Sequence, residues 1–154
     1  MLPPNMAADL ARYKIEQHYR TGPDGPWIEH LMDDEGFSHA QAREAMLGWE
    51  KIPYIDAEHG HMATLIKKGR EVHFAIFKRF RKSGHVTNER IKEFLQPILD
   101  DNVFLITKID RPEDSRFIEW LGFEPLSVAP DGIQCYILNN IKYPRLHNVS
   151  SIQA

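Results

Sequence analysis

Residues 71–87 read EVHFAIFKRFRKSGHVT, and this stretch decides the fold class. In Glu71–Phe77 both sets of alternating positions are mostly apolar, which is typical of a strand covered on both faces of a sheet. The strand pattern continues to Phe80, and the loop Arg81–Thr87 follows it. Beyond the loop, apolar side chains recur at helical spacing, at Ile91, Phe94, Leu95, Ile98 and Leu99. The stretch therefore predicts a strand, a glycine-containing loop and a helix in succession.

The residues before this stretch predict helices first and strands afterwards. The segment from Ala11 to Tyr19 fits a strand or a helix, because its spacing does not decide between the two. One helix is predicted between Asp24 and Gly36, and a second begins at the capping box formed by Ser38 and Gln41. Two strands should precede Glu71–Phe80, at Tyr54–Glu58 and Met62–Ile66.

The residues after it alternate between helices and strands. Pro97 should kink or end the helix that follows the loop. A buried strand is predicted at Val103–Ile106, a short helix between Pro112 and Gly122, and a closing hairpin at Leu126–Val128 and Gln134–Leu138. This order of elements predicts an α/β fold (α+β, with a central mixed sheet) flanked by about four helices.

Length and composition favour one globular domain over residues 1–154, with a tail of little pattern at 139–154. The chain has 154 residues, of which 42% are hydrophobic and 27% charged, whereas disordered chains are poorer in apolar residues. No apolar run approaches the roughly 20 residues that cross a bilayer, and MLPPNMAADLARYK is not a secretion signal, so we expect an intracellular protein. The single cysteine, Cys135, excludes a disulfide scaffold.

Charge is unevenly spread along the chain. Between Lys67 and Lys92 there are nine Lys or Arg residues and two acidic ones, 9 − 2 = +7, so the remainder carries −3 − 7 = −10. Such a local basic segment favours an anionic ligand at one place over general coating of nucleic acid. The alternative is a solvated strand edge protected by lysines.

The strand–loop–helix unit resembles one found in the GNAT superfamily of acetyl-CoA-dependent N-acyltransferases. That family carries an Arg/Gln-x-x-Gly-x-Gly/Ala loop after its fourth strand, and RKSGHV here matches it at Arg81 and Gly84 but departs at Val86. The segment Trp120–Glu124, WLGFE, also resembles the family's last-helix ending. The order of elements matches over almost the whole chain, and the motifs match over about Glu71–Glu124.

The resemblance implies that the chain binds acetyl-CoA and an amine acceptor. Backbone N–H groups that open a helix, near its positive dipole end, suit a pyrophosphate, and glycine permits close approach. The predicted cofactor-binding residues are Phe77, Arg79, Arg81, Lys82, Ser83, Gly84, His85, Val86 and Thr87. The alternative is an ordinary strand-to-helix turn with solvated basic residues.

An acyltransferase also needs a base for the amine and an acid for the departing thiolate. By resemblance the base lies near the start of the fourth strand, which makes Glu71 the first candidate and His73 the second, since histidine ordinarily titrates near neutral pH. Each also has a structural alternative. Glu71 could be a surface partner for Lys68 or Arg70, and His73 could be a hydrogen-bonded histidine of the core. Many members carry a tyrosine that acts as the general acid at the position of Ile118. Because isoleucine has no proton to give, Tyr136 is the remaining candidate for the acid.

The missing acid motif leaves a second function open. The segments Glu71–Ile76 and Arg116–Phe123 resemble divergent GNAT-like proteins of tailed bacteriophages, some of which are virion components. The chain would then be a catalytically reduced phage structural or interaction protein, located in the virion rather than the cytoplasm, with protein partners or a homo-oligomer. A DNA-modifying phage enzyme would require salt-dependent DNA binding, and no nucleic-acid partner or membrane span is expected.

Two smaller features have simple structural explanations. His59 and His61 lie on one side of an extended segment, but a zinc site needs a third ligand, so we predict a polar turn and no metal. Cys135 lies in an apolar strand pattern and is predicted to be a small buried residue rather than a nucleophile.

Overall fold

The computed structural model describes residues 4–141, which fall into two compact units, one ending at Val86 and one beginning at Thr87. The single domain expected from the length stays a prediction. Of the predicted tail at 139–154, residues 142–154 lie outside the described residues.

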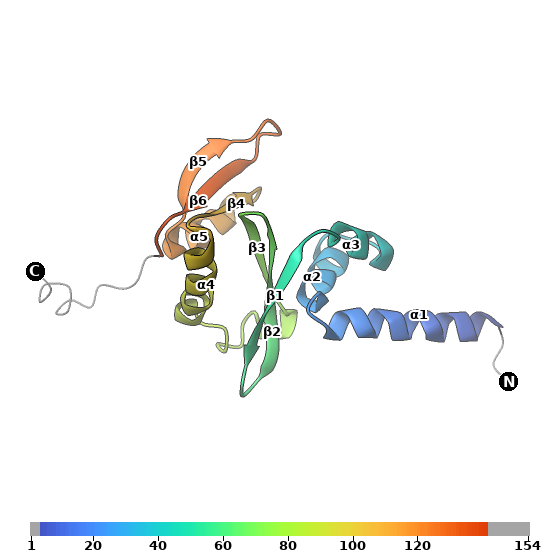
Figure 1. Ribbon diagram of the computed structural model, residues 1–154. Coiled ribbons are helices and arrows are strands. Elements are labelled where there is room, and N and C mark those ends of the chain that lie inside the picture. The colour runs from blue at the N-terminus through green and yellow to red at the C-terminus, as the bar shows by residue number, and fades with distance from the viewer. Residues whose placement is uncertain (1–3, 142–154) are drawn as a thin grey trace, which may run out of the picture. The chain divides into compact units, whose positions relative to one another are not determined.

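Helices occupy the first half of the first unit. They are α1 (Pro4–Thr21), α2 (Gly25–Glu29), the π-helical turn η1 (His30–Asp34) and α3 (His39–Ala45). Of the two structures left open for Ala11–Tyr19, the chain adopts the helix, and the single helix predicted between Asp24 and Gly36 is divided into α2 and η1. The capping box is confirmed, since Gln41 N donates to Ser38 Oγ at 3.1 Å and Ser38 N donates to Gln41 Oε1 at 2.8 Å. In Figure 1, α2 and α3 lie beside the strands of this unit and α1 extends away from them.

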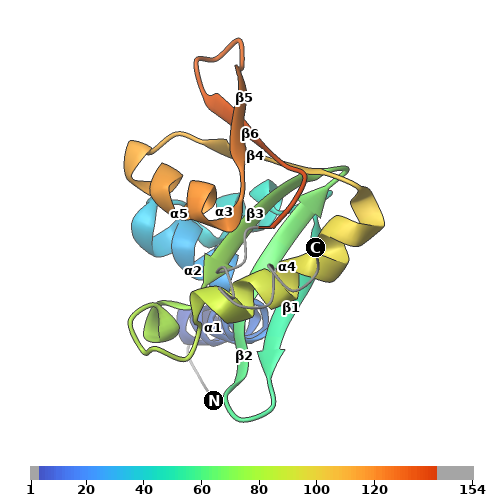
Figure 2. The same cartoon turned by 90° about the vertical axis from the view of Figure 1, so that its left-hand side faces the viewer.

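Three antiparallel strands complete the first unit, in the order β1 (Glu50–Asp56), β2 (Gly60–Lys68), β3 (Glu71–Ile76). Figure 2 shows β1 and β2 as a long hairpin. The middle strand β2 supplies the core, since Met62–Ile66 are all buried. The strand predicted from Tyr54 begins four residues earlier and contains Pro53, which a strand paired along one edge tolerates because proline lacks an N–H group.

The strand predicted over Glu71–Phe80 is too long in its C-terminal part. It ends at Ile76, and the 3₁₀ turn η2 (Lys78–Phe80) follows. Phe77 is 4% exposed, and its N–H donates to the carbonyl of Met62 at 2.9 Å. Burial of this ring inside the unit turns the chain away from the strand direction, which the alternating pattern does not reveal.

The second unit contains α4 (Asn88–Asn102), β4 (Leu105–Ile109), the 3₁₀ turn η3 (Pro112–Asp114), α5 (Ser115–Leu121), β5 (Glu124–Val128) and β6 (Gln134–Leu138). Its strands are antiparallel, with β6 between β4 and β5. The short helix between Pro112 and Gly122 and the closing hairpin are confirmed. Cys135 is buried on β6, as predicted.

Two predictions for this unit need correction. Pro97 does not end α4, which continues to Asn102, because Ile91, Leu95 and Leu99 on both sides of it are buried on one face, and burial of an amphipathic face stabilises a helix more than propensity does. The kink at Pro97 stays a prediction. Val103 is not in a strand: it is the C-terminal cap of α4, with φ of +70°, and its N–H donates to Leu99 O at 2.8 Å.

The mixed α+β fold class is confirmed, with five α-helices and six strands in the part of the chain that the structure describes. None of the helices within residues 4–141 combines the length and the apolar character needed to cross a bilayer.

Candidate active site

Glu71 and His73, the two candidate bases, form a hydrogen-bonded pair at the start of β3. They lie two residues apart on one strand, so their side chains project from the same face. His73 Nε2 donates to Glu71 Oε2 at 2.7 Å, and the two side chains are 26% and 30% exposed. The structure thus joins both residues in one group that solvent and a substrate can reach.

Two tryptophans surround the imidazole of this pair. The ring of His73 is edge-on to Trp49 at 5.5 Å and to Trp27 at 6.4 Å between centroids. Trp27, on α2, is fixed in turn because its Nε1 donates to the carbonyl of Thr64 on β2 at 3.0 Å. Edge-to-face packing of this kind restricts the rotation of the imidazole. The imidazole of the Glu71–His73 pair is therefore held in one orientation.

The opposite end of β3 carries the predicted cofactor loop, which is fixed by residues of α2 and β2. Phe77 is buried there, and its ring is edge-on to His61 at 5.0 Å. The N–H of Lys78 donates to Glu29 Oε2 at 2.7 Å. Gly25 allows this packing, because a Cβ there would lie 2.6 Å from Phe77 Cζ and 2.2 Å from Arg20 O. The start of the loop is consequently fixed in position.

Arg81, a residue of the matched motif, is bound within its own unit. Its Nη1 donates to Asp34 Oδ2 at 3.1 Å and its Nε to the carbonyl of Ile76 at 3.2 Å. His30 Nδ1 donates to the same Asp34 oxygen at 2.9 Å. The hydrogen bond from His30 is the main cause that lowers the pKa of Asp34 below its usual 3.8; burial opposes it, and the hydrogen bond and charge of Arg81 lower the pKa further. Arg81 thus ties the loop to η1 and to the end of β3.

Arg79 and Lys82, the other two cations among the predicted cofactor-binding residues, are both exposed but differ in what their side chains contact. The guanidinium of Arg79 lies over the rings of Phe77 and Phe80, 4.4 and 4.9 Å from their centroids, close enough to be attracted to the ring faces. Lys82 is exposed to solvent at the tip of the loop. Lys82 is therefore the loop cation best placed to meet an anion.

The backbone of the loop is partly used by its own turn. Arg81 N donates to Lys78 O and Ser83 N to Phe80 O, both at 3.3 Å, while His85 N donates to Ser83 Oγ at 3.2 Å. Among the described residues, this leaves the N–H groups of Lys82, Gly84 and Val86 as donors that the turn does not use. Gly84 has φ of +80°, and a Cβ there would meet nothing within 4 Å. The loop offers an open, basic surface with some of its amides available.

Thr87 belongs to the second unit and caps α4. Its Oγ1 accepts a hydrogen bond from Arg90 N at 3.3 Å, which satisfies one of the free N–H groups of the first turn. Its proposed contact with a cofactor stays a prediction.

The histidines of the β1–β2 hairpin are used separately, and no metal cluster forms. His59 Nδ1 donates to Asp56 Oδ2 at 2.7 Å and its ring stacks on that of His85 at 3.8 Å. His61 Nε2 instead contacts Thr64 Oγ1 at 2.8 Å. Burial lowers the pKa of His61, and Arg79 adds to the effect. Within residues 4–141, no three His, Cys, Asp or Glu side chains are grouped as a metal site requires.

The candidate acid, Tyr136, lies in the second unit, on β6. It is 7% exposed and pairs with Thr107 on β4 and Pro125 on β5. Ile118, at the position where the family often has tyrosine, lies on α5. The role of Tyr136 as an acid stays a prediction.

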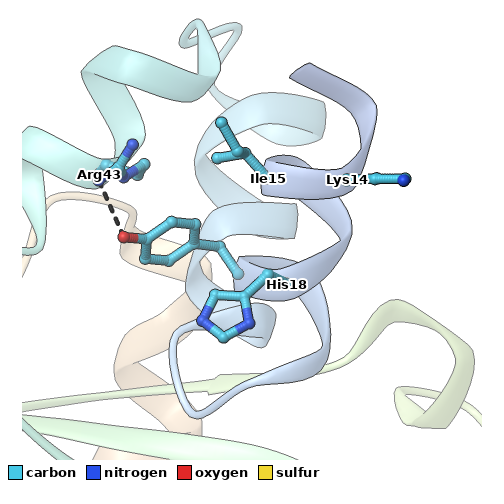
Figure 3. Close-up of a pocket in the computed structure, with 5 residues that line it drawn as sticks. Lys14, Ile15, His18 and Arg43 are labelled. Carbon is cyan, nitrogen blue, oxygen red and sulfur yellow. Dashed lines mark hydrogen bonds between the residues drawn. The ribbon is translucent and has the colours of Figure 1, made fainter. Parts of the chain in front are cut away.

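A pocket of about 400 Å³ lies elsewhere in the first unit, between α1 and α3 (Figure 3). It is lined by Lys14, Ile15, His18, Tyr19 and Arg43. Arg43 Nη2 donates to Tyr19 Oη at 2.8 Å, and the guanidinium lies 4.2 Å from the centroid of that ring. This pocket contains none of the sequence-predicted site residues.

Sequence patterns gave no indication of the residues that surround the Glu71–His73 pair and brace the loop. These are Trp27, Trp49, His30 and Asp34. Asp34 is 47 residues from Arg81, and the tryptophans come from segments predicted only as helix or connection. The one available signal was the acidic character of the first helical region, which does not identify a partner.

No family model and no curated protein sequence matches the chain. Solved structures do. The ribosomal-protein-S18-alanine N-acetyltransferase of Escherichia coli is 11% identical, with a TM-score of 0.47 over 71% of this chain and 81% of that one. A spermidine N-acetyltransferase SpeG mutant of Vibrio cholerae is 11% identical, with 0.48 over 66% and 75%. Ard1 of Thermoplasma volcanium is 20% identical, with 0.42 over 66% and 77%.

These values describe a likeness of fold and carry no information on substrate or activity. The bacteriophage origin and the virion role have no support in the comparisons. The chain is similar over part of its length to solved structures that include two N-acetyltransferases.

Proposed function

We propose that the chain is an acyl-CoA-dependent N-acyltransferase of the GNAT type, acting on a primary amine. The observation that carries the proposal is the 2.7 Å contact between Glu71 Oε2 and His73 Nε2 on one face of β3. A paired carboxylate and imidazole, partly exposed, is the arrangement that removes a proton from an attacking nucleophile. The motif resemblance at Arg81 and Gly84 supports the cofactor class.

Glu71 and His73 divide the work of the base. Because a carboxylate only accepts, Glu71 holds the proton of a neutral His73 on Nε2 and leaves Nδ1 as the acceptor. Trp27 and Trp49 keep the ring from rotating out of this position. An ammonium that reaches His73 loses a proton to Nδ1, and Glu71 stabilises the imidazolium that forms. The free amine is then the nucleophile.

The loop from Phe77 to Val86 fits an acyl-CoA in its chemistry. Acetyl-CoA would supply the acyl group as an activated thioester, and its pyrophosphate is an anion that Lys82 and free amide N–H groups can bind. The open space at Gly84 permits backbone approach. Arg81 and Arg79 hold the shape of the loop, and Thr87 continues the chain into α4. Tyr136 is the side chain proposed to return a proton to the thiolate.

Thiol release from acetyl-CoA, measured with a panel of primary amines, tests this proposal. We expect amine-dependent release by the wild type, and a decrease of about 100-fold in Glu71→Gln, within the range that general bases contribute. Acetyl-CoA binding should be unchanged, because Glu71 lies at the other end of β3 from the loop. Glu58→Gln, in the exposed β1–β2 turn, is the control. Equal rates in Glu71→Gln and Glu58→Gln would exclude the Glu71–His73 pair as the general base.

A further inference from the structure

The ammonium of Lys68 lies in the same side-chain cluster as Glu71 and His73, the pair proposed as the general base. Its Nζ is 5.1 Å from the centroid of Trp49, within the distance at which a cation is attracted to a ring face. Gly48 provides the space, because a Cβ there would lie 3.5 Å from Lys68 Cε and 3.7 Å from Nζ. The lysine is exposed to solvent. It is thus held over an indole while remaining accessible.

The strand register places Lys68 on the side of the sheet that carries Glu71 and His73. Lys68 on β2 is directly opposite Glu71 on β3, and side chains directly opposite in an antiparallel pair project from the same face. Glu71 binds His73, and the ring of His73 contacts Trp49. A single indole therefore touches both the lysine cation and the imidazole of the base.

We propose that Lys68 is an acyl acceptor within its own chain, so that the protein acetylates itself at this residue. The inference rests on the proposed function, since it needs the acyl thioester and the base pair. Lys68 is a primary ammonium, which is the chemical class of acceptor that the site requires. No other lysine of the first unit is opposite Glu71 in the β2–β3 register.

The transfer balances without any further reactant besides the acyl thioester. One proton leaves Nζ of Lys68 for the Glu71–His73 pair, and the nitrogen lone pair attacks the thioester carbonyl carbon. A C–N bond forms and the C–S bond breaks, and the sulfur leaves with the bonding electron pair. The thiolate takes up the second proton lost from nitrogen. The products are an N-acetyl-lysine, a free thiol and one proton released to water through the base.

The acetylated side chain would lose its interaction with Trp49. An amide is neutral, so the attraction between cation and ring disappears. The reaction then occurs once per chain and opens the face of the indole to an external amine. Lys68 would in this way delay turnover until it is acetylated.

Peptide mass spectrometry after incubation with acetyl-CoA tests the inference. We expect acetylation of Lys68 to be at least about 10-fold faster than that of the exposed lysines Lys14 and Lys108, a conservative part of what a general base contributes. The rate constant should not depend on protein concentration, because the transfer is intramolecular. In Glu71→Gln the rate at Lys68 should fall to that of the two control lysines.

Several results would overturn the inference. These are equal acetylation of all three lysines, a rate at Lys68 that rises with protein concentration, or a rate that Glu71→Gln leaves unchanged. The selectivity among lysines is measured on the wild type and does not depend on the variant folding. Calorimetric binding of acetyl-CoA to the same sample separates the two proposals. Absence of binding removes the proposed function, whereas binding without preference for Lys68 removes this inference alone.

Discussion

The two ends of β3 use their charged side chains in different ways. At the N-terminal end, Glu71 and His73 bind each other and remain partly exposed. At the C-terminal end, Arg81 is bound by Asp34 and Arg79 lies over two phenyl rings. The charged groups of the first end bind each other on one strand, whereas those of the second hold a loop in shape. Charge counted along a sequence therefore overestimates the charge that a ligand meets.

The largest effect expected is at the N-terminal end. His73→Ala should lower amine-dependent thiol release by about 100-fold or more, because it removes the group that accepts the proton. Acetyl-CoA binding should remain within twofold of the wild type. His18→Ala, a histidine exposed on α1, is the control and should retain full activity. A full rate in His73→Ala would show that the pair is only structural.

The next effect concerns the buried residue Phe77 at the start of the loop. Gly25→Ala would place a Cβ 2.2 Å from Arg20 O and 2.6 Å from Phe77 Cζ. Overpacking of this kind should lower the free energy of unfolding by about 1–3 kcal/mol, measured by urea denaturation. Gly22→Ala meets its nearest atom at 3.4 Å and should change the stability much less. Similar losses in both variants would mean that Phe77 does not fix the loop.

A smaller effect should separate the exposed cation from the bound one. Lys82→Ala should weaken acetyl-CoA binding by about 1.4- to 5-fold at low salt, since an exposed charge contributes roughly 0.2–1 kcal/mol, and the difference should vanish at high salt. Its unfolding free energy should be unchanged. Asp34→Ala should instead lower stability, because His30 and Arg81 each lose one hydrogen-bond acceptor. Calorimetry and denaturation on both variants check this contrast, and a stability loss in Lys82→Ala would contradict it.

The smallest effect is the pH dependence of His61, which contacts Phe77 beneath the loop. Thr64 Oγ1 donates its hydrogen to Pro23 O at 2.6 Å, so the neutral His61 ring must donate from Nε2 to that oxygen. Because folding lowers the pKa of His61 below 6.5, the unfolded chain binds more protons. Its contribution to stability is therefore present above pH 6.5 and is lost as the pH falls below that value.

Denaturation midpoints between pH 8 and pH 5 measure this contribution. The wild type should lose more stability than His61→Gln over that range, by less than about 1 kcal/mol because the ring is only partly buried and solvent screens it. A wild type that gains stability relative to His61→Gln as the pH falls would contradict the assignment.

The sequence predicts local features of this protein well and distant pairings poorly. The alternation of residues along Glu71–Phe77 places Glu71 and His73 on one face, and the capping box at Ser38 and Gln41 is complete within four residues. Both predictions follow from spacing. The end of β3 at Ile76 depends instead on burial of Phe77 just before the 3₁₀ turn at Lys78–Phe80, and the continuation of α4 through Pro97 depends on burial of its apolar face.

The same division applies to the candidate site. The loop and the base candidates were predicted from motifs and strand position. That Arg81 is bound by Asp34, and that two tryptophans enclose His73, depends on how α2 and the segment before β1 pack on the strands. A linear pattern contains no signal for such contacts, so the partition of the basic residues into bound and available ones required the structure.

Titration calorimetry with acetyl-CoA tests the central claim most directly, because both proposals require the loop after β3 to bind it. We expect micromolar binding to the wild type that is lost in Gly84→Trp. Gly132→Trp is the matched control, since Gly132 has φ of +87° and equally open space, and it should bind normally. Absence of heat at millimolar acetyl-CoA, or normal binding to Gly84→Trp, would contradict the assignment of this loop as the cofactor site.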